Sequence, residues 1–255
     1  MRLLVVLMSI AMPLVAWLSQ RGAFGPTQDV VSDAFPTLLV AAGYAFSIWG
    51  LIFALDVAYA IWQATGERRR DPTLARVAPL AAAGFALTAV WMPLFSMGLF
   101  GLCVLVIFAA LACTARAAVV LSRDAAPVAR QRLWAWLPLS LHAGWLSLAA
   151  FLNVAQTIVA YRMLPVDDML GWSAVLFVLA AVVLLVLNAR MRGNVAYVAA
   201  AVWGLAAVVV RQSQGTLDGS QVAAGIALVI AVVLIGQTLW LRFARPRVVE
   251  AAHTP

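Results

Sequence analysis

Eight long runs of apolar residues divide this chain, and each is long enough to cross a lipid bilayer. A hydrocarbon core of about 30 Å needs roughly 20 predominantly apolar residues in one helix. The runs lie near residues 3–19, 37–64, 78–97, 99–121, 134–161, 171–189, 194–210 and 221–241. An outer-membrane β-barrel would show short alternating segments instead. The sequence therefore predicts an all-α integral membrane protein with eight transmembrane helices.

The composition excludes several other classes of protein. Hydrophobic residues make up 65% of the 255 positions and charged residues only 11%, whereas soluble domains have about 45–50% and about 25%. Disordered chains, collagen-like repeats, disulfide scaffolds and nucleic-acid-binding modules do not have this composition, so we expect no nucleic-acid partner. Cys103 and Cys113 lie too far apart along one predicted helix to form a disulfide, and we expect both to be buried thiols.

The distribution of charge predicts the topology. The chain has 17 basic residues, all arginine, and a net charge of +7. The arginines gather after the second, fourth, sixth and eighth runs, whereas the other connections carry acids with few arginines, or no charge. By the positive-inside rule, both termini lie in the cytoplasm, and we expect a bacterial inner (cytoplasmic) membrane. The first run follows Arg2 but shows no clear cleavage site near Ser19-Gln20-Arg21, so we expect a retained helix and not a signal peptide.

The runs differ in composition. The second, third and fifth hold most of the aromatic and polar side chains, whereas the last three consist mainly of alanine, valine and leucine. A change near Pro165–Asp168 predicts a five-helix bundle over 1–165, a three-helix extension over 166–245 and a polar cytoplasmic tail over 246–255. Gly204 and Gly236 favour close helix packing in the extension, which would brace the bundle or replace a dimer contact.

Aromatic and polar side chains recur at helical spacing along three runs. They are Phe46, Trp49, Phe53 and Asp56 in the second run, Thr88, Trp91 and Phe95 in the third, and His142, Trp145, Ala149, Asn153 and Gln156 in the fifth. Residues spaced in this way share a helix face, and polar groups that face lipid are costly. We therefore expect the three faces to point inward and to line one pocket, without residues of the extension.

Each of these assignments has a structural alternative. Trp49, Trp91 and Trp145 share faces with polar groups, which favours ligand contact over simple packing. Asp56 is a functional candidate, but a structural partner or a position near the membrane surface remains open. His142 lacks a second metal ligand at suitable spacing, which favours a hydrogen-bonding role over a metal site. Six further tryptophans are interpreted as interfacial anchors: Trp17, Trp62, Trp134, Trp136, Trp172 and Trp240.

Motifs for catalysis or cofactor binding do not occur in the sequence. It contains no GxSxG or HExxH motif, no Walker loop and no glycine-rich dinucleotide fingerprint. The second histidine, His253, lies in the polar tail. We therefore expect no catalytic residue, no metal site and no cofactor.

Three stretches resemble the tryptophan-rich sensory protein family, also called the translocator protein or peripheral-type benzodiazepine receptor (TspO/MBR) family. Residues 43–53 (GYAFSIWGLIF) are similar to the start of the family's second helix. Residues 88–95 (TAVWMPLF) match its third-helix pattern Asn-x-x-Trp-x-Pro-x-Phe, except for Thr88. Residues 145–153 (WLSLAAFLN) match its fifth-helix Trp and Asn. The resemblance covers about residues 1–161. The family's proline-tyrosine pair before that Trp is missing, and the last three runs are additional to its usual five helices.

The resemblance implies a five-helix bundle around a pocket that opens near the loop between the first two runs. It also implies porphyrins, sterols or other flat hydrophobic molecules as ligands, a homodimer, and a ligand-binding role for Tyr44. We therefore expect a receptor or carrier in the membrane, not an enzyme. Two alternatives remain: a proton-coupled secondary transporter of a small solute that uses Asp56, and a porphyrin-modifying enzyme. Few buried charges and the lack of an internal repeat speak against the transporter.

Overall fold

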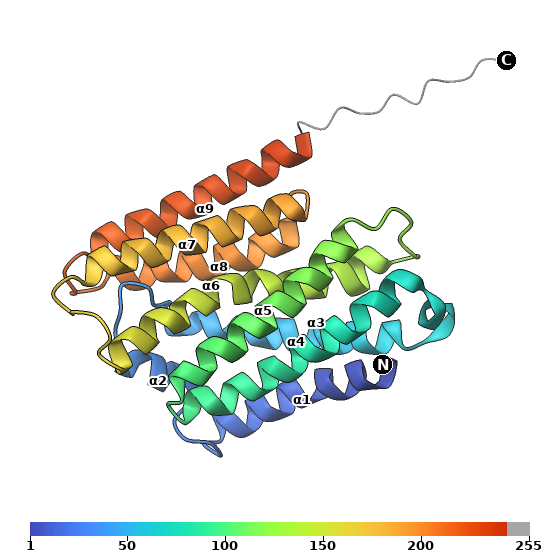
Figure 1. Ribbon diagram of the computed structural model, residues 1–255, viewed down its shortest axis with the longest axis horizontal. Coiled ribbons are helices and arrows are strands. Elements are labelled where there is room, and N and C mark those ends of the chain that lie inside the picture. Colours follow the sequence, from blue (N-terminus) through green and yellow to red (C-terminus); the bar gives the residue numbers. More distant parts are fainter. Residues whose placement is uncertain (244–255) are drawn as a thin grey trace.

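The computed structural model describes residues 1–243, which form a bundle of helices (Figure 1). Eight helices are long and apolar enough to span a membrane. They are α1 (Arg2–Gln20), α3 (Ile48–Gln63) with the preceding 3-10 turn η1 (Gly43–Ser47), α4 (Pro72–Ser96), α5 (Phe100–Ser122), α6 (Leu137–Ala160) with the preceding π-helical turn η3 (Arg132–Trp136), α7 (Met169–Arg190), α8 (Val195–Ser213) and α9 (Ser220–Phe243). The predicted fold class and the predicted number of spans are confirmed. The predicted tail 246–255, including His253, lies outside the described residues.

The connections alternate between the two ends of the bundle. The N-terminus, the α3–α4, α5–α6 and α7–α8 connections and the end of α9 lie at the right-hand end of Figure 1. The other connections, with the short helix α2 (Gln28–Ala34), lie at the opposite end. The arginine-rich connections therefore share one end of the molecule, as a membrane topology requires.

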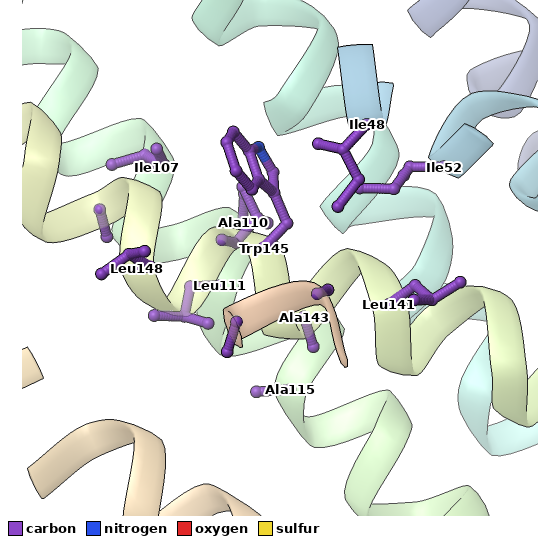
Figure 2. Close-up of a cluster of buried hydrophobic side chains, with 14 of the residues drawn as sticks. Ile48, Ile52, Ile107, Ala110, Leu111, Ala115, Leu141, Ala143, Trp145 and Leu148 are labelled. Carbon is purple, nitrogen blue, oxygen red and sulfur yellow. The ribbon is translucent and has the colours of Figure 1, made fainter. Parts of the chain in front are cut away.

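Helix packing runs through the bundle in a continuous series. α4 packs against α1 and α5, α5 packs against α6, and α6 packs against α8, which in turn contacts α9. Figure 2 shows part of this interior, where Ala110, Ala115 and Ala143 lie among larger side chains such as Leu111 and Leu148. Small residues at these positions allow neighbouring helices to approach closely. The extension is thus packed directly on the fifth membrane helix of the bundle.

A hydrogen-bonded arginine holds the first helix in place. Arg2 Nη1 donates to Gln63 Oε1 over 2.7 Å and to the Leu74 carbonyl oxygen over 2.9 Å. These two partners come from the end of α3 and the start of α4. α1 is therefore tied to the α3–α4 connection, where Asp71 caps α4 by accepting a hydrogen bond from the Leu74 amide. Because of this cap, α4 begins at Pro72, six residues before the predicted run.

The second membrane span differs from its prediction. The run 37–64 was expected to be helical throughout, but residues 36–42 form an irregular segment and α3 begins only at Ile48. α8 supplies hydrogen-bond partners for this segment and for η1. The Ala42 amide donates to the Ala207 carbonyl oxygen over 3.0 Å, and Gln212 Nε2 donates to the Thr37 carbonyl oxygen over 2.9 Å. Non-helical backbone at membrane depth is stable where other protein groups form hydrogen bonds with its N–H and C=O groups.

Two glycines allow α6 and α8 to approach each other. A Cβ atom on Gly144 of α6 would overlap the backbone carbonyl of Tyr197, and one on Gly204 of α8 would lie 2.6 Å from Leu148 Cδ2 and 3.3 Å from Trp145 Cζ3. The close packing expected of Gly204 is therefore present. A Cβ atom on Gly236 would meet open space, with no neighbouring atom of the described chain within 4 Å, so the expectation for Gly236 is wrong among these residues.

We predict that Gly144→Ala destabilises the protein, because the added methyl group meets backbone that cannot move without separating α6 from α8. Overpacking of this kind costs about 1–3 kcal/mol, which corresponds to a loss of about 2–12 °C in melting temperature. Thermal unfolding in detergent measures the change. Gly225→Ala is the control, because Gly225 is also helical but has open space around it. An equal effect of both substitutions would contradict the close approach at Gly144.

Candidate ligand-binding site

Three tryptophans from three helices meet inside the bundle. The ring centroid of Trp49 on α3 lies 6.0 Å from that of Trp145 on α6 and 6.4 Å from that of Trp91 on α4. Trp49 also stacks on Phe53 at 5.1 Å, and Trp91 stacks on Phe95 at 4.8 Å. The helix faces that the sequence singled out therefore converge on one aromatic cluster.

Two adjacent cavities border this cluster. The larger cavity has a volume of about 400 Å³ and is lined by residues of α1, α2, η1, α3 and α4. The smaller cavity has a volume of about 30 Å³ and is lined mainly by α4, α6 and residues 40–41, with one residue each from α2, η1 and α3. Phe46, Trp49 and Trp91 line both cavities, so these three side chains form the partition between them.

The structure brings eight of the twelve predicted ligand-binding residues to these cavities. They are Phe46, Trp49, Phe53, Trp91, Phe95, Trp145, Ala149 and Asn153. Gln156 also lines the smaller cavity, where its Nε2 donates to Ser32 Oγ over 2.9 Å. Within residues 1–243, no side chain of α7, α8 or α9 lines either cavity. The extension instead contacts the outer side of Trp145, where Gly204 of α8 packs against the indole ring.

Four of the predicted residues lie elsewhere. Tyr44 is 46% exposed, and its ring contacts Trp203 of α8 edge to face. Asp56, Thr88 and His142 are fully buried on the far side of the aromatic cluster and line neither cavity.

Polar groups on the wall of the smaller cavity are mostly hydrogen-bond donors. Trp91 Nε1 donates to Asn153 Oδ1 over 2.9 Å, which orients the Asn153 amide so that its NH₂ group points away from Trp91. Asn153 Nδ2 and Trp145 Nε1 are both buried and have no hydrogen-bond partner among the described residues. A buried donor without a partner costs about 1–3 kcal/mol. The site is therefore suited to a ligand atom that accepts hydrogen bonds.

Asp56, His142 and Thr88 form a buried hydrogen-bonded chain beside the aromatic cluster. His142 Nδ1 lies 2.8 Å from Asp56 Oδ2, and its Nε2 lies 3.1 Å from Thr88 Oγ1. Thr88 Oγ1 has one proton, which it donates either to the Gly84 carbonyl oxygen, 2.9 Å away, or to His142. In the first case His142 Nε2–H donates to Thr88, and the proton between Nδ1 and Asp56 Oδ2 lies on either atom, which gives an ion pair or a neutral pair. In the second case Nδ1–H donates to the Asp56 carboxylate and the imidazole is neutral. The heavy-atom positions are therefore compatible with more than one arrangement of the protons along this chain.

The edge of Trp49 faces this chain. The ring centroids of Trp49 and His142 lie 5.7 Å apart, and the two rings are perpendicular. The ring of Phe85 stacks in parallel on the His142 imidazole, with 5.9 Å between the centroids. The position of His142, and through it that of Trp49, therefore depends on the Asp56 contact.

Comparison with protein families identifies the chain. A family model described as TSPO-like protein matches residues 2–240. The chain belongs to the TSPO-like protein family. The match extends past residues 1–161, on which the resemblance rested, through α7 and α8 and into most of α9. With eight helices of membrane-spanning length and composition in residues 1–243, this TSPO-like protein is an integral membrane protein of a ligand-binding or transport class. Comparisons with curated proteins and with solved structures find no match.

Several residues at the mouth of this TSPO-like site were not predicted from the sequence. Trp17 was assigned to the membrane interface, but it lines the larger cavity, and the Arg21 guanidinium lies 4.8 Å from its ring centroid. Gln28 and Asp29 line the same cavity from α2, which is too short to show a helical pattern. Trp62 and Trp172, also assigned to the interface, are only 9% and 8% exposed and pack inside the protein.

We predict that Asp56→Leu destabilises the protein by about 3–5 kcal/mol, because it leaves His142 buried without its partner. The double variant Asp56→Leu/His142→Leu should recover part of this loss, since both polar groups are then removed together. Chemical unfolding in detergent measures the four free energies, of the wild type, Asp56→Leu, His142→Leu and the double variant, and the double-mutant cycle isolates the contribution of the pair. Additive effects of the two single substitutions would contradict a coupled pair.

Proposed function

We propose that this TSPO-like protein binds a flat, largely apolar ring ligand that carries a hydrogen-bond acceptor, such as a porphyrin-like tetrapyrrole, and holds or passes it on without converting it. The observation that carries the proposal is the convergence of Trp49, Trp91 and Trp145 around two cavities, with unpartnered N–H groups on the inner wall. Aromatic faces stack well on flat ring systems, and a few polar groups orient them.

The sizes of the cavities support a particular placement of the ligand. The larger cavity, about 400 Å³, falls within the range of small-molecule sites, whereas the smaller one, about 30 Å³, has room for a water-sized group. The ring system would therefore lie in the larger cavity and direct one acceptor atom past Trp49 toward Asn153 and Trp145. A sterol-like ligand with one oxygen fits the same scheme. Arg21 at the mouth is placed to meet a carboxylate side arm.

We predict that Trp145→Phe weakens binding of protoporphyrin about fivefold, because it removes one N–H donor and keeps most of the ring. Trp49→Ala should weaken binding tenfold or more, since it removes stacking area from both cavities. Ligand absorbance and fluorescence are titrated against purified protein in detergent. Trp240→Phe, at an indole that is 66% exposed and far from both cavities in the chain, is the matched control.

Equal affinity in the wild type, Trp145→Phe and Trp49→Ala would remove the assigned site. The same samples separate binding from catalysis. Ligand recovered after incubation in the dark should have an unchanged absorption spectrum and mass, and a new product would instead support the porphyrin-modifying enzyme.

A second candidate function, proton-coupled transport of a small solute, rests on the buried Asp56–His142 pair. This pair is able to gain or lose a proton, and the edge contact of His142 with Trp49 links it to the partition between the cavities. We predict for this function that Asp56→Asn abolishes pH-driven uptake of ligand into proteoliposomes, because the amide cannot take up a proton. If the protein only binds the ligand, the wild type and Asp56→Asn should show the same uptake of ligand.

We also propose the membrane in which the protein lies, its orientation and its oligomeric state. The membrane is the inner membrane of a bacterium, with the arginine-rich end of the bundle and both termini in the cytoplasm, and the protein forms a homodimer. The location of the three arginine-rich connections and of the end of α9 at one end of the bundle supports this orientation (Figure 1).

A further inference from the structure

A third cavity lies at the arginine-rich end of the bundle, away from the aromatic cluster. Its volume is about 420 Å³, and it lies between the α5–α6 connection, the α7–α8 turn and the last turn of α9. It shares no lining residue with the two cavities of the aromatic cluster. η3 and α6 connect the two regions, since Arg132 and Trp136 of η3 line this cavity and α6 carries Trp145 and Asn153 of the aromatic site.

Three arginines line this basic cavity: Arg132, Arg192 and Arg242. Among its lining residues the carboxylate is Asp124, whose oxygens accept hydrogen bonds from the Ala126 amide and from Gln131 Nε2, over 3.2 and 2.6 Å. None of the three arginines forms an ion pair with a carboxylate of residues 1–243. Three positive charges thus surround a polar hollow with one lining carboxylate, Asp124, which forms hydrogen bonds within its own connection and no ion pair with these arginines.

The turn that carries Arg192 is held by packing. Arg192 and Gly193 both have positive φ, 62° and 75°, and a Cβ atom on Gly193 would lie 3.0 Å from the Thr238 carbonyl oxygen and 3.2 Å from Arg242 Cγ. The α7–α8 turn therefore rests directly on the end of α9. This contact brings the backbone positions of Arg192 and Arg242 together without an anion.

A buried polar network forms the floor of the basic cavity. Asn194 is 1% exposed, and its Nδ2 donates to Ser140 Oγ over 2.7 Å, while its Oδ1 accepts from the amides of Ala196 and Tyr197. Trp136 Nε1 donates to Ser122 Oγ over 3.0 Å. These bonds connect α5, α6 and α8, so the floor is rigid before any ligand arrives.

Apolar side chains beside the basic cavity face outward. Leu133, Val195 and Phe243 are 49%, 46% and 81% exposed. Val195 lines the cavity, and Leu133 and Phe243 directly follow the lining residues Arg132 and Arg242 in the sequence. Guanidinium groups match the geometry of phosphate oxygens, and basic pockets between transmembrane helices bind lipid headgroups. Exposed apolar side chains next to such a pocket offer contact to acyl chains.

We propose that the basic cavity binds the phosphate headgroup of an anionic phospholipid, with the guanidinium groups of Arg132, Arg192 and Arg242 around the phosphate and the acyl chains against the adjacent apolar surface. The site is independent of the ligand proposed for the aromatic cluster.

The test measures lipid binding to the purified full-length protein in detergent by native mass spectrometry and by lipid-dependent thermal stability. Phosphatidylglycerol should bind and stabilise at concentrations about tenfold lower than phosphatidylcholine, which has no net charge. The triple variant Arg132→Gln/Arg192→Gln/Arg242→Gln should lose this preference. Arg192→Lys keeps the positive charge but loses the planar guanidinium group, so this variant should retain part of the preference for phosphatidylglycerol.

A matched control removes three arginines at the same end of the bundle but outside the cavity. Arg69→Gln/Arg70→Gln/Arg76→Gln carries the same change in net charge and should keep the preference for phosphatidylglycerol. Equal losses in both triple variants, or equal binding of both lipids to the wild type, would overturn the proposal. Inorganic phosphate and glycerol phosphate are added in competition; displacement of the lipid at equal concentration would assign the cavity to a soluble phosphate compound instead.

Discussion

Backbone polar groups at membrane depth must find partners within the protein, and in this TSPO-like protein that requirement ties the ligand site to α8. Residues 36–42 are not helical, yet they reach into the bundle and supply Val40 and Ala41 to the smaller cavity. Their carbonyl and amide groups are satisfied in part by Ala207 and Gln212 of α8. An irregular wall allows side chains to line a cavity that a continuous helix would fill, but it is stable only beside a helix that supplies these hydrogen bonds.

The three-helix extension therefore supports the site, although it does not line it. α8 approaches α6 at Gly144 and lies behind Trp145 at Gly204, while Phe46 and Trp49 contact Trp145 from the other helices. Trp203 adds a hydrogen bond from its Nε1 to the Ala45 carbonyl oxygen over 3.2 Å. A boundary near residue 165 describes the change in composition, whereas the contacts between α6 and α8 cross it. The family match, which runs to residue 240, also crosses it.

Hydrophobicity and helical spacing were sufficient to predict the eight spans and to find the faces that carry Trp49, Trp91 and Trp145. The irregular backbone of residues 38–42 could not be recognised from the sequence, because Leu38, Leu39 and Val40 are as apolar as the residues of a membrane-spanning helix. The pairing of Asp56 with His142 joins positions 86 residues apart, and spacing within one helix contains no information about it. The mouth was missed for a related reason: Trp17 looks the same in sequence whether it faces lipid headgroups or a cavity, and α2 is too short for periodicity to appear.

The larger cavity takes its walls from neighbouring membrane helices, with Ala16 and Trp17 on α1 and Trp49 and Gly50 on α3. A hydrophobic ring compound of the kind proposed above, dissolved in the bilayer, would lie beside these helices before it binds and would not need to cross an aqueous phase. For such a compound the relevant concentration is its mole fraction in one leaflet, which exceeds its concentration in water by the partition coefficient. Selection among ligands would then begin with lipid solubility, and a modest intrinsic affinity would be enough for occupancy.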